Sequence, residues 1–237
     1  MNISKYIYHL HDEEFHGLRA YNAASMYSLP TVLIVHDWSG CGEFVVNKAQ
    51  ELAKLGYLGF AVDMYGDGKT GETTEEKSAL MQPLINDRAI LRARIIAALD
   101  AVAAMPEVDP QRIAIIGYCF GGLCALDLAR SGAALCGAVS FHGLLNKPNA
   151  LDNASIKAKI LALHGYDDPM VLPAAVQDFC AEMTVAHVDW QMHVYGNTQH
   201  AFSNPKANDI AAGIVYNSVA DKRSWLAMLN FLHEIFL

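Results

Sequence analysis

One stretch, Arg112–Gly122 (RIAIIGYCFGG), constrains the fold of this chain more than any other segment. Its first part, Ile113–Ile116, is a short apolar run with β-branched residues, which is typical of a strand buried on both faces of a parallel sheet. A glycine lies two positions before and two positions after Cys119, and the Ala/Leu-rich residues Leu123–Arg130 predict a helix. The stretch therefore predicts a strand, a sharp turn and a helix, with a thiol at the turn.

This arrangement matches the G-x-S-x-G nucleophile elbow, with sulfur in place of oxygen. A Cβ atom at Gly117 or Gly121 would crowd the neighbouring strand or helix, so the turn needs both glycines. The N-terminus of the following helix points at Cys119, and its free N–H groups favour a thiolate and a developing oxyanion. A buried structural cysteine beside glycines is the alternative interpretation of this motif, so other segments have to decide between the two.

The rest of the chain alternates between apolar runs and helical patterns. Predicted strands cover Thr31–Val35, Leu58–Val62, Ala138–Phe141, Lys159–His164 and Val188–Tyr195, and an edge hairpin pairs Ser4–Leu10 with Phe15–Ala20. Predicted helices cover Glu43–Leu55, Asn86–Met105, Pro173–Met183, Asp209–Asn217 and Val219–Phe236, and Lys69–Gln82 is predicted as a loop with a short helix. With no repeat and no linker, residues 1–237 form one α/β domain in this prediction, with a mostly parallel central sheet of about eight strands and helices on both faces.

Composition narrows the class of protein further. The chain of 237 residues carries a net charge of −8 without a basic cluster, so we expect no nucleic-acid partner. No apolar segment approaches the length of a membrane span, and residues 1–15 hold charges and histidines where a signal peptide has an apolar run. The five cysteines are odd in number and scattered, which is typical of reduced thiols in a cytoplasmic protein.

Four candidate functional segments follow predicted strands directly. They contain Asp37, Cys119, Asp168 and His200. In a parallel sheet, the carboxyl ends of the strands meet at one edge, where ligands bind. The last three residues occur in the order nucleophile, acid, histidine, which is the chain order of the α/β-hydrolase triad. The shared position and order favour catalysis by Cys119 over a structural role.

The segments HDWSG, GYCFGG, YDDPMV and QHAFSNP resemble the dienelactone hydrolase family of α/β-hydrolases, as does AQELAKLGY followed by an apolar strand and DMYG. The resemblance extends from about Pro30 to the C-terminus. It implies that Cys119 is the nucleophile, His200 the base and Asp168 the acid, with Asp167 as the competing acid.

The resemblance also implies an oxyanion hole. At two positions, however, the sequence departs from the family pattern. The backbone N–H groups of Phe120 and Trp38 are the expected oxyanion donors. Asp37 stands where the family has a thiol-activating Glu, so we expect Asp37 to activate the thiol or to contact substrate. Asn204 stands where relatives that act on an anionic lactone have an Arg. The candidates for a replacement charge are Lys206, Arg88 and Arg92.

The sequence therefore predicts a hydrolase that cleaves a small-molecule ester or lactone through an acyl-thioester, without a cofactor or a bound metal, as a monomer or a dimer. One alternative is a metal-dependent hydrolase that uses the N-terminal cluster His9, His11, Asp12 and His16. Another is a non-catalytic binding protein on the same fold. Three further histidines at strand ends are predicted to be structural: His36, His142 and His164.

Overall fold

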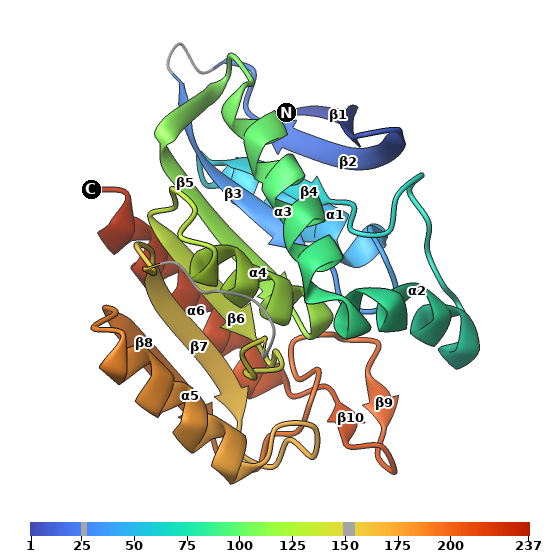
Figure 1. The fold of residues 1–237 in the computed structure, drawn as a ribbon, viewed down its shortest axis with the longest axis vertical. Coiled ribbons are helices and arrows are strands. Elements are labelled where there is room, and N and C mark those ends of the chain that lie inside the picture. Colours follow the sequence, from blue (N-terminus) through green and yellow to red (C-terminus); the bar gives the residue numbers. More distant parts are fainter. Residues whose placement is uncertain (25–27, 149–154) are drawn as a thin grey trace.

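The computed structural model of the protein describes residues 1–24, 28–148 and 155–237. Its centre is an eight-stranded sheet with the order β1-β2-β4-β3-β5-β6-β7-β8 (Figure 1). These strands are β1 (Asn2–Leu10), β2 (Glu13–Tyr21), β3 (Leu29–Val35), β4 (Leu58–Val62), β5 (Val108–Tyr118), β6 (Gly137–Phe141), β7 (Lys159–Gly165) and β8 (Trp190–Tyr195).

Most of this sheet is parallel. Strands β4, β3, β5, β6, β7 and β8 pair in parallel, whereas β1 and β2 form an antiparallel hairpin whose second strand joins β4. The predicted mostly parallel sheet with an edge hairpin is confirmed. Because the parallel strands run the same way, the loops that follow β3, β4, β5, β7 and β8 all emerge at one edge.

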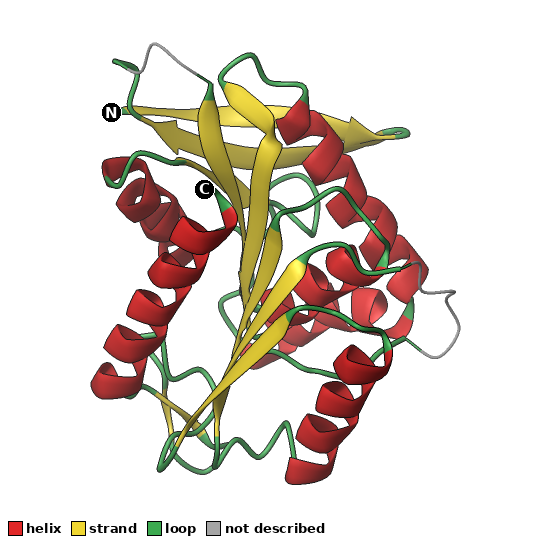
Figure 2. Cartoon of the chain, turned by 90° about the vertical axis from the view of Figure 1, so that its left-hand side faces the viewer, coloured by secondary structure: helices red, strands yellow, loops and turns green. Residues whose placement is uncertain are grey.

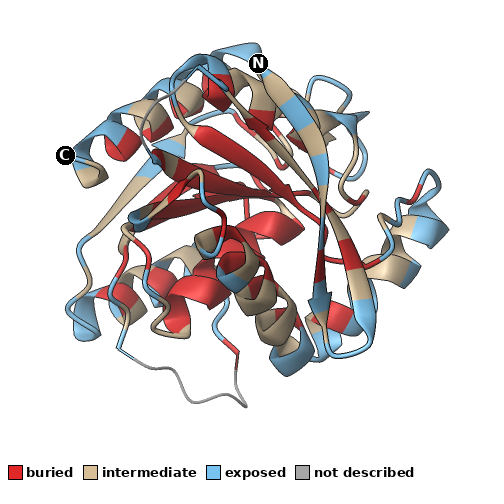
Figure 3. Ribbon diagram, turned by 90° about the horizontal axis from the view of Figure 1, so that it is seen from above, coloured by how far each residue is buried: buried red, intermediate tan, exposed pale blue. Residues whose placement is uncertain are grey.

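Helices cover both faces of the sheet (Figure 2). One face packs against α1 (Glu43–Lys54) and α6 (Ser218–Ile235), and the other against α2 (Thr74–Asn86), α3 (Arg88–Ala103), α4 (Phe120–Arg130) and α5 (Pro173–Val185). In α1 the residues Val45, Ala49, Leu52 and Ala53 are buried, because their spacing places them on one side of the helix. The inner strands are buried on both faces, as the coloured ribbon shows (Figure 3).

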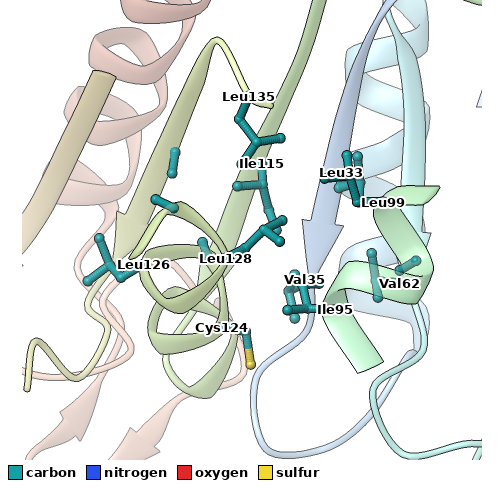
Figure 4. Packing of buried hydrophobic residues seen from close by; sticks show 14 of the residues in the cluster. Leu33, Val35, Val62, Ile95, Leu99, Ile115, Cys124, Leu126, Leu128 and Leu135 are labelled. Carbon is teal, nitrogen blue, oxygen red and sulfur yellow. The ribbon is translucent and has the colours of Figure 1, made fainter. Parts of the chain in front are cut away.

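Helix α4 is the most deeply buried helix. Its residues from Phe120 to Arg130 are all buried, and Leu126 and Leu128 pack in the cluster that also holds Ile115 of β5 and Val35 of β3 (Figure 4). A helix enclosed in this way cannot shift without opening the core, because protein interiors are close-packed. The turn that connects β5 to α4 is therefore held on a rigid support.

Three predictions of local structure need correction. The predicted helix Asp209–Asn217 is wrong: this segment contains the short antiparallel strands β9 (Asn208–Asp209) and β10 (Ile214–Val215). These two strands pair with each other, and the segment also pairs with the backbone of His200, since His200 N–H donates to Gly213 and Val215 N–H donates to His200. In the region predicted as a loop with a short helix, α2 runs from Thr74 to Asn86, and the predicted helix Asn86–Met105 begins at Arg88 because Asp87 accepts two N–H groups as its N-cap.

Candidate active site

Cys119 occupies a strained turn between β5 and α4. Its φ of 55° and ψ of −114° lie outside the regions that side chains other than glycine usually adopt, and its N–H donates to Phe141 O at 3.0 Å. A Cβ atom at Gly117 would lie 1.9 Å from the backbone oxygen of Gly121. One at Gly121 would lie 2.3 Å from the backbone oxygen of Val35. The predicted strand–turn–helix and its need for both glycines are confirmed.

His200 and Asp168 form a buried hydrogen-bonded pair beside this turn. His200 Nδ1 lies 2.7 Å from Asp168 Oδ2, and the two residues are 1% and 3% exposed. The other carboxylate oxygen, Oδ1, accepts the N–H of Met170 at 2.8 Å. Asp167, in contrast, is exposed and contributes its N–H to Thr198 O. Of the two candidate acids, the structure therefore pairs Asp168 with the imidazole.

The remaining ring nitrogen of His200, Nε2, is the group available to the thiol. It is buried and has no hydrogen-bond partner among the residues that the structure describes. Burial lowers the pKa of His200, but the negative charge of the Cys119 thiolate and the hydrogen bond to Asp168 outweigh it and raise the pKa to about 10. The environment of His200 therefore favours the protonated imidazole.

Asp37 lies in the loop after β3, but its carboxylate is bonded elsewhere than to sulfur. Oδ1 accepts the N–H of Ser39 at 2.9 Å and its hydroxyl at 2.5 Å, and Oδ2 accepts the amide of Asn204 at 3.3 Å. In the described part of the chain, no hydrogen bond joins Asp37 to Cys119. Asn204, which stands where the family pattern has an Arg, therefore hydrogen-bonds to Asp37, which stands where that pattern has a Glu.

The two predicted oxyanion donors belong to two different segments, the start of α4 and the loop after β3. Phe120 is the first residue of α4, and the first N–H groups of a helix have no acceptor within it. Trp38 is half-buried in the loop after β3, and its carbonyl accepts the hydroxyl of Tyr65 at 2.9 Å. Tyr65, whose ring stacks on Phe120 at 5.8 Å, was missed by the sequence analysis, although its segment DMYG directly follows β4.

Three further histidines at strand ends are buried, and two of them, His142 and His164, lie near His200. His36 bonds only to backbone atoms, as predicted for a structural histidine. His142 bonds instead to Ser203 Oγ through Nε2 at 2.7 Å, and its ring centroid lies 5.2 Å from that of His200. Burial lowers the pKa of His142 and of His164, and the charge of His200 lowers both further. The positive charge in this group of rings therefore belongs on His200.

The candidate replacement cations all interact with other groups of the protein, and for Arg92 one of these groups is Asp127. Arg88 donates twice to the buried carboxylate of Asp127, at 2.6 Å each, and Lys206 donates to Glu43 at 2.9 Å on the surface. Arg92 lies on α3, one turn after Arg88. The guanidinium of Arg88 is therefore already neutralised within the core between α3 and α4.

In the N-terminal histidine cluster, the carboxylate of Glu14 lies close to two imidazole rings, those of His9 and His16. Glu14 Oε2 lies 3.5 Å from His9 Nε2, and Oε1 lies 2.6 Å from His16 Nε2, while His11 sits in the hairpin turn with φ of 53°. Within residues 1–24, 28–148 and 155–237, no three His, Cys, Asp or Glu side chains are arranged to hold a metal ion. In the same ranges, no helix is both long and apolar enough to cross a membrane.

Comparison with known proteins decides the family. The model of the dienelactone hydrolase family matches residues 18–236, nearly the whole chain. The chain belongs to the dienelactone hydrolase family. The resemblance drawn from the motifs is confirmed, and the matched region begins earlier than Pro30.

Comparisons with individual proteins support the same family assignment for this dienelactone hydrolase family member. A protein of Aquifex aeolicus named "Putative carboxymethylenebutenolidase" is 28% identical, covering 90% of this chain and 92% of its own. The solved structure named m3DLH is 37% identical with a TM-score of 0.95, over 100% of this chain and 99% of that one. The dienelactone hydrolase-like promiscuous phosphotriesterase P91, from metagenomic libraries, is 35% identical with a TM-score of 0.95 over the same shares. The protein is a hydrolase with the α/β-hydrolase fold of this family.

Proposed function

We propose that this protein hydrolyses carboxylic esters or lactones through Cys119, His200 and Asp168. One observation carries the proposal: a buried imidazole, bonded to a buried carboxylate at 2.7 Å, lies close enough to the cysteine at a strained strand-to-helix turn for the charge of that cysteine to raise the imidazole pKa. A nucleophile, a base and a group that orients the base are the parts that nucleophilic catalysis requires.

In the state that precedes acylation, the proton is already on His200. The raised pKa of His200, about 10, supports an imidazole that is protonated at neutral pH and faces the sulfur of Cys119 as its counter-ion in the proposed reaction. The thiolate attacks the acyl carbon, and the oxyanion accepts the N–H groups of Phe120 and Trp38. When the oxyanion collapses, His200 Nε2–H donates its proton to the leaving alkoxide, and Asp168 keeps the proton on Nδ1 throughout.

Deacylation uses the same imidazole in the opposite sense. The alcohol leaves, or remains attached as the opened arm of a lactone, and the acyl group stays on sulfur as a thioester. His200, now neutral at Nε2, takes a proton from a water molecule that attacks the thioester. The second oxyanion collapses with expulsion of the thiolate, which releases the carboxylate and restores the ion pair.

The surroundings of the thiol favour an uncharged substrate. Asp37 contributes a carboxylate to this edge of the sheet, and its bonds go to Ser39 and Asn204, neither of which is a cation. A substrate carboxylate placed near Asn204 would meet the charge of Asp37 where the family's Arg would have attracted it. We therefore propose a neutral ester or lactone as the preferred substrate, with an anionic dienelactone as a poor one.

A substrate panel with matched variants tests the proposal. We expect the purified protein to hydrolyse aryl esters and uncharged lactones, in the presence of a strong chelator, faster than it hydrolyses lactones that carry a carboxylate. Cys119→Ala should abolish this activity, and Cys136→Ala, which removes a partly exposed thiol from another region, should retain it. A phosphotriester belongs in the panel, because the relative P91 is described as acting on one.

The same panel separates the alternatives. Activity that disappears with the chelator would favour a metal-dependent hydrolase and contradict the proposal. Binding of the panel compounds without turnover would favour a binding protein. Full activity in Cys119→Ala would show that another group is the nucleophile.

A further inference from the structure

His36 directly follows β3, and its imidazole is packed against the turn that carries Cys119. It is 1% exposed, and its ring centroid lies 4.7 Å from that of Tyr65 and 6.0 Å from that of Phe120. The backbones are close as well, because a Cβ atom at Gly121 would lie 2.6 Å from the carbonyl oxygen of His36. The end of β3 and the cysteine turn therefore form one packed unit.

Backbone partners on both ring nitrogens fix the tautomer of His36. Nδ1 lies 2.5 Å from the carbonyl oxygen of Asp37, so Nδ1 carries a proton and donates it. Nε2 lies 3.2 Å from the backbone nitrogen of Met64, whose N–H donates to it, so Nε2 carries no proton. Burial lowers the pKa of His36, in keeping with a neutral ring. The imidazole thus connects the loop after β3 to the loop after β4.

The bond from Nδ1 determines where the N–H of Trp38 points. The Asp37 carbonyl and the Trp38 N–H belong to one planar trans peptide, so they point in opposite directions. With its carbonyl held by His36, this peptide keeps its N–H directed away from the imidazole. The next peptide is also fixed at both ends, since Tyr65 donates to the Trp38 carbonyl at 2.9 Å and the Ser39 N–H donates to the Asp37 carboxylate at 2.9 Å.

We infer that His36 is a positioning residue for the oxyanion hole, which acts by holding the Asp37–Trp38 peptide with its N–H toward the reacting carbonyl. The inference rests on the proposed function, in which the Trp38 N–H is one of the two oxyanion donors. An oxyanion donor lowers the barrier because it is oriented before the reaction. A peptide free to rotate would instead present the Asp37 carbonyl oxygen, which repels the developing negative charge.

Two substitutions distinguish the effects of the two hydrogen bonds that the His36 ring makes. The amide nitrogen of Asn is as many bonds from Cα as Nδ1, so His36→Asn retains a donor for the Asp37 carbonyl. The amide oxygen of Gln is as many bonds from Cα as Nε2, so His36→Gln retains an acceptor for Met64 and leaves the Asp37 carbonyl without its donor. Removal of an oxyanion donor costs about 10²–10³ in kcat, so a donor that is merely misdirected should cost about 10- to 100-fold in kcat/KM. We expect this loss in His36→Gln and kcat/KM close to that of the wild-type protein in His36→Asn.

Two reactions of Cys119 distinguish positioning from general damage to the fold. An aldehyde analogue of the substrate adds to the thiolate, forming a carbon–sulfur bond while its carbonyl becomes an oxyanion. Alkylation by iodoacetamide forms no oxyanion. His36→Gln should weaken aldehyde binding by the same factor as kcat/KM and leave the alkylation rate of Cys119 unchanged.

The outcomes separate this inference from the proposed function. Equal kcat/KM and equal aldehyde affinity in the wild-type protein and both variants would overturn the role of His36 and leave thiol-dependent hydrolysis intact. If the wild-type protein hydrolysed no ester, the proposed function would fail, and the aldehyde affinities would still decide the role of His36. If His36→Gln did not fold, nitrogen NMR of histidine-labelled wild-type protein would decide: a ring proton on Nδ1 of His36 supports the inference, and one on Nε2 overturns it.

Discussion

At the scale of single residues, the choice between Asp167 and Asp168 has a direct kinetic consequence. Asp168→Asn should keep the fold but present the wrong tautomer of His200 to the thiol, and the corresponding change in a serine triad costs on the order of 10⁴ in kcat. Asp167→Asn alters an exposed side chain and should cost far less. Steady-state kinetics of the two purified variants, with circular dichroism to verify folding, test this ranking. The reverse ranking would assign the acid to Asp167.

The pKa of His200 should depend on the thiol. After burial, which lowers it, the charge of Cys119 is the largest influence on this pKa and raises it. Cys119→Ser replaces a thiolate with a neutral hydroxyl, so the pKa of His200 should fall from about 10. In the wild-type protein the imidazolium is present below that value and is lost as the pH rises through it, so activity should decline on the alkaline side. Ring-proton NMR titration of both proteins measures the difference, and identical titrations would show that no ion pair exists.

Sequence patterns located these side chains, but they could not specify the hydrogen bonds between them. Cys119, Asp168 and His200 could be proposed because each follows an apolar strand, and such strand ends meet at one edge of a parallel sheet. The hydrogen bond between Asn204 and Asp37 joins two polar residues far apart in the chain, and neither residue lies in a local sequence pattern that predicts this contact. His36 and Tyr65 bond to backbone atoms. Because every residue has these atoms, a sequence pattern cannot identify which ones will be the partners.

At the scale of elements, the turn between β5 and α4 should be intolerant of a single methyl group. In Gly121→Ala the new Cβ atom would lie 2.3 Å from the Val35 backbone oxygen, and backbone cannot move aside as a flexible side chain can. Overpacking of this kind costs about 1–3 kcal/mol or more. Gly196→Ala is a matched control, since a Cβ atom there would meet nothing within 4 Å. Thermal unfolding should show a lower melting temperature for Gly121→Ala only, and equal losses would contradict the packing described for this turn.

Elements with a strong local signal were predicted well, and those defined by distant partners were not. The apolar run of β4 and the amphipathic pattern of α1 were recognisable from sequence because their own residues determine the burial. The segment that forms β9 and β10 was mistaken for a helix because its structure depends on pairing with His200, a tertiary contact. Helix α2 extends through Pro83, a residue that usually ends a helix, so its length was underestimated.

At the scale of the whole molecule, a buried ionic network joins three of the helices that cover one face of the sheet. Asp127 of α4 accepts Arg88 of α3 and Arg130 of α4, and Arg130 also donates to Glu182 of α5 at 2.7 Å. The side chains of Arg130 and Asp127 are 1% and 0% exposed, so neither charge has water as an alternative partner. The network therefore holds α3 and α5 against the helix that supports the nucleophile.

Breaking this network should destabilise the whole fold. Arg130→Met leaves the carboxylates of Asp127 and Glu182 without one partner, and removal of one member of a buried ion pair costs about 3–5 kcal/mol. Lys206→Met breaks an ion pair whose side chains are 82% and 72% exposed, so it should leave the midpoint of unfolding unchanged. Urea unfolding of the two variants provides the comparison. Equal midpoints would mean that the buried network contributes no more than a surface pair.

In the proposed mechanism the acyl group passes through the sulfur of Cys119, and mass spectrometry of the acylated protein can detect this intermediate. The protein is mixed with a slowly deacylating aryl ester, quenched in acid during the first turnover, digested and mapped. We expect one added acyl group, on the peptide that contains Cys119, formed no more slowly than the alcohol is released and absent from Cys119→Ala. An acyl group on another residue, or continued turnover by Cys119→Ala, would contradict it.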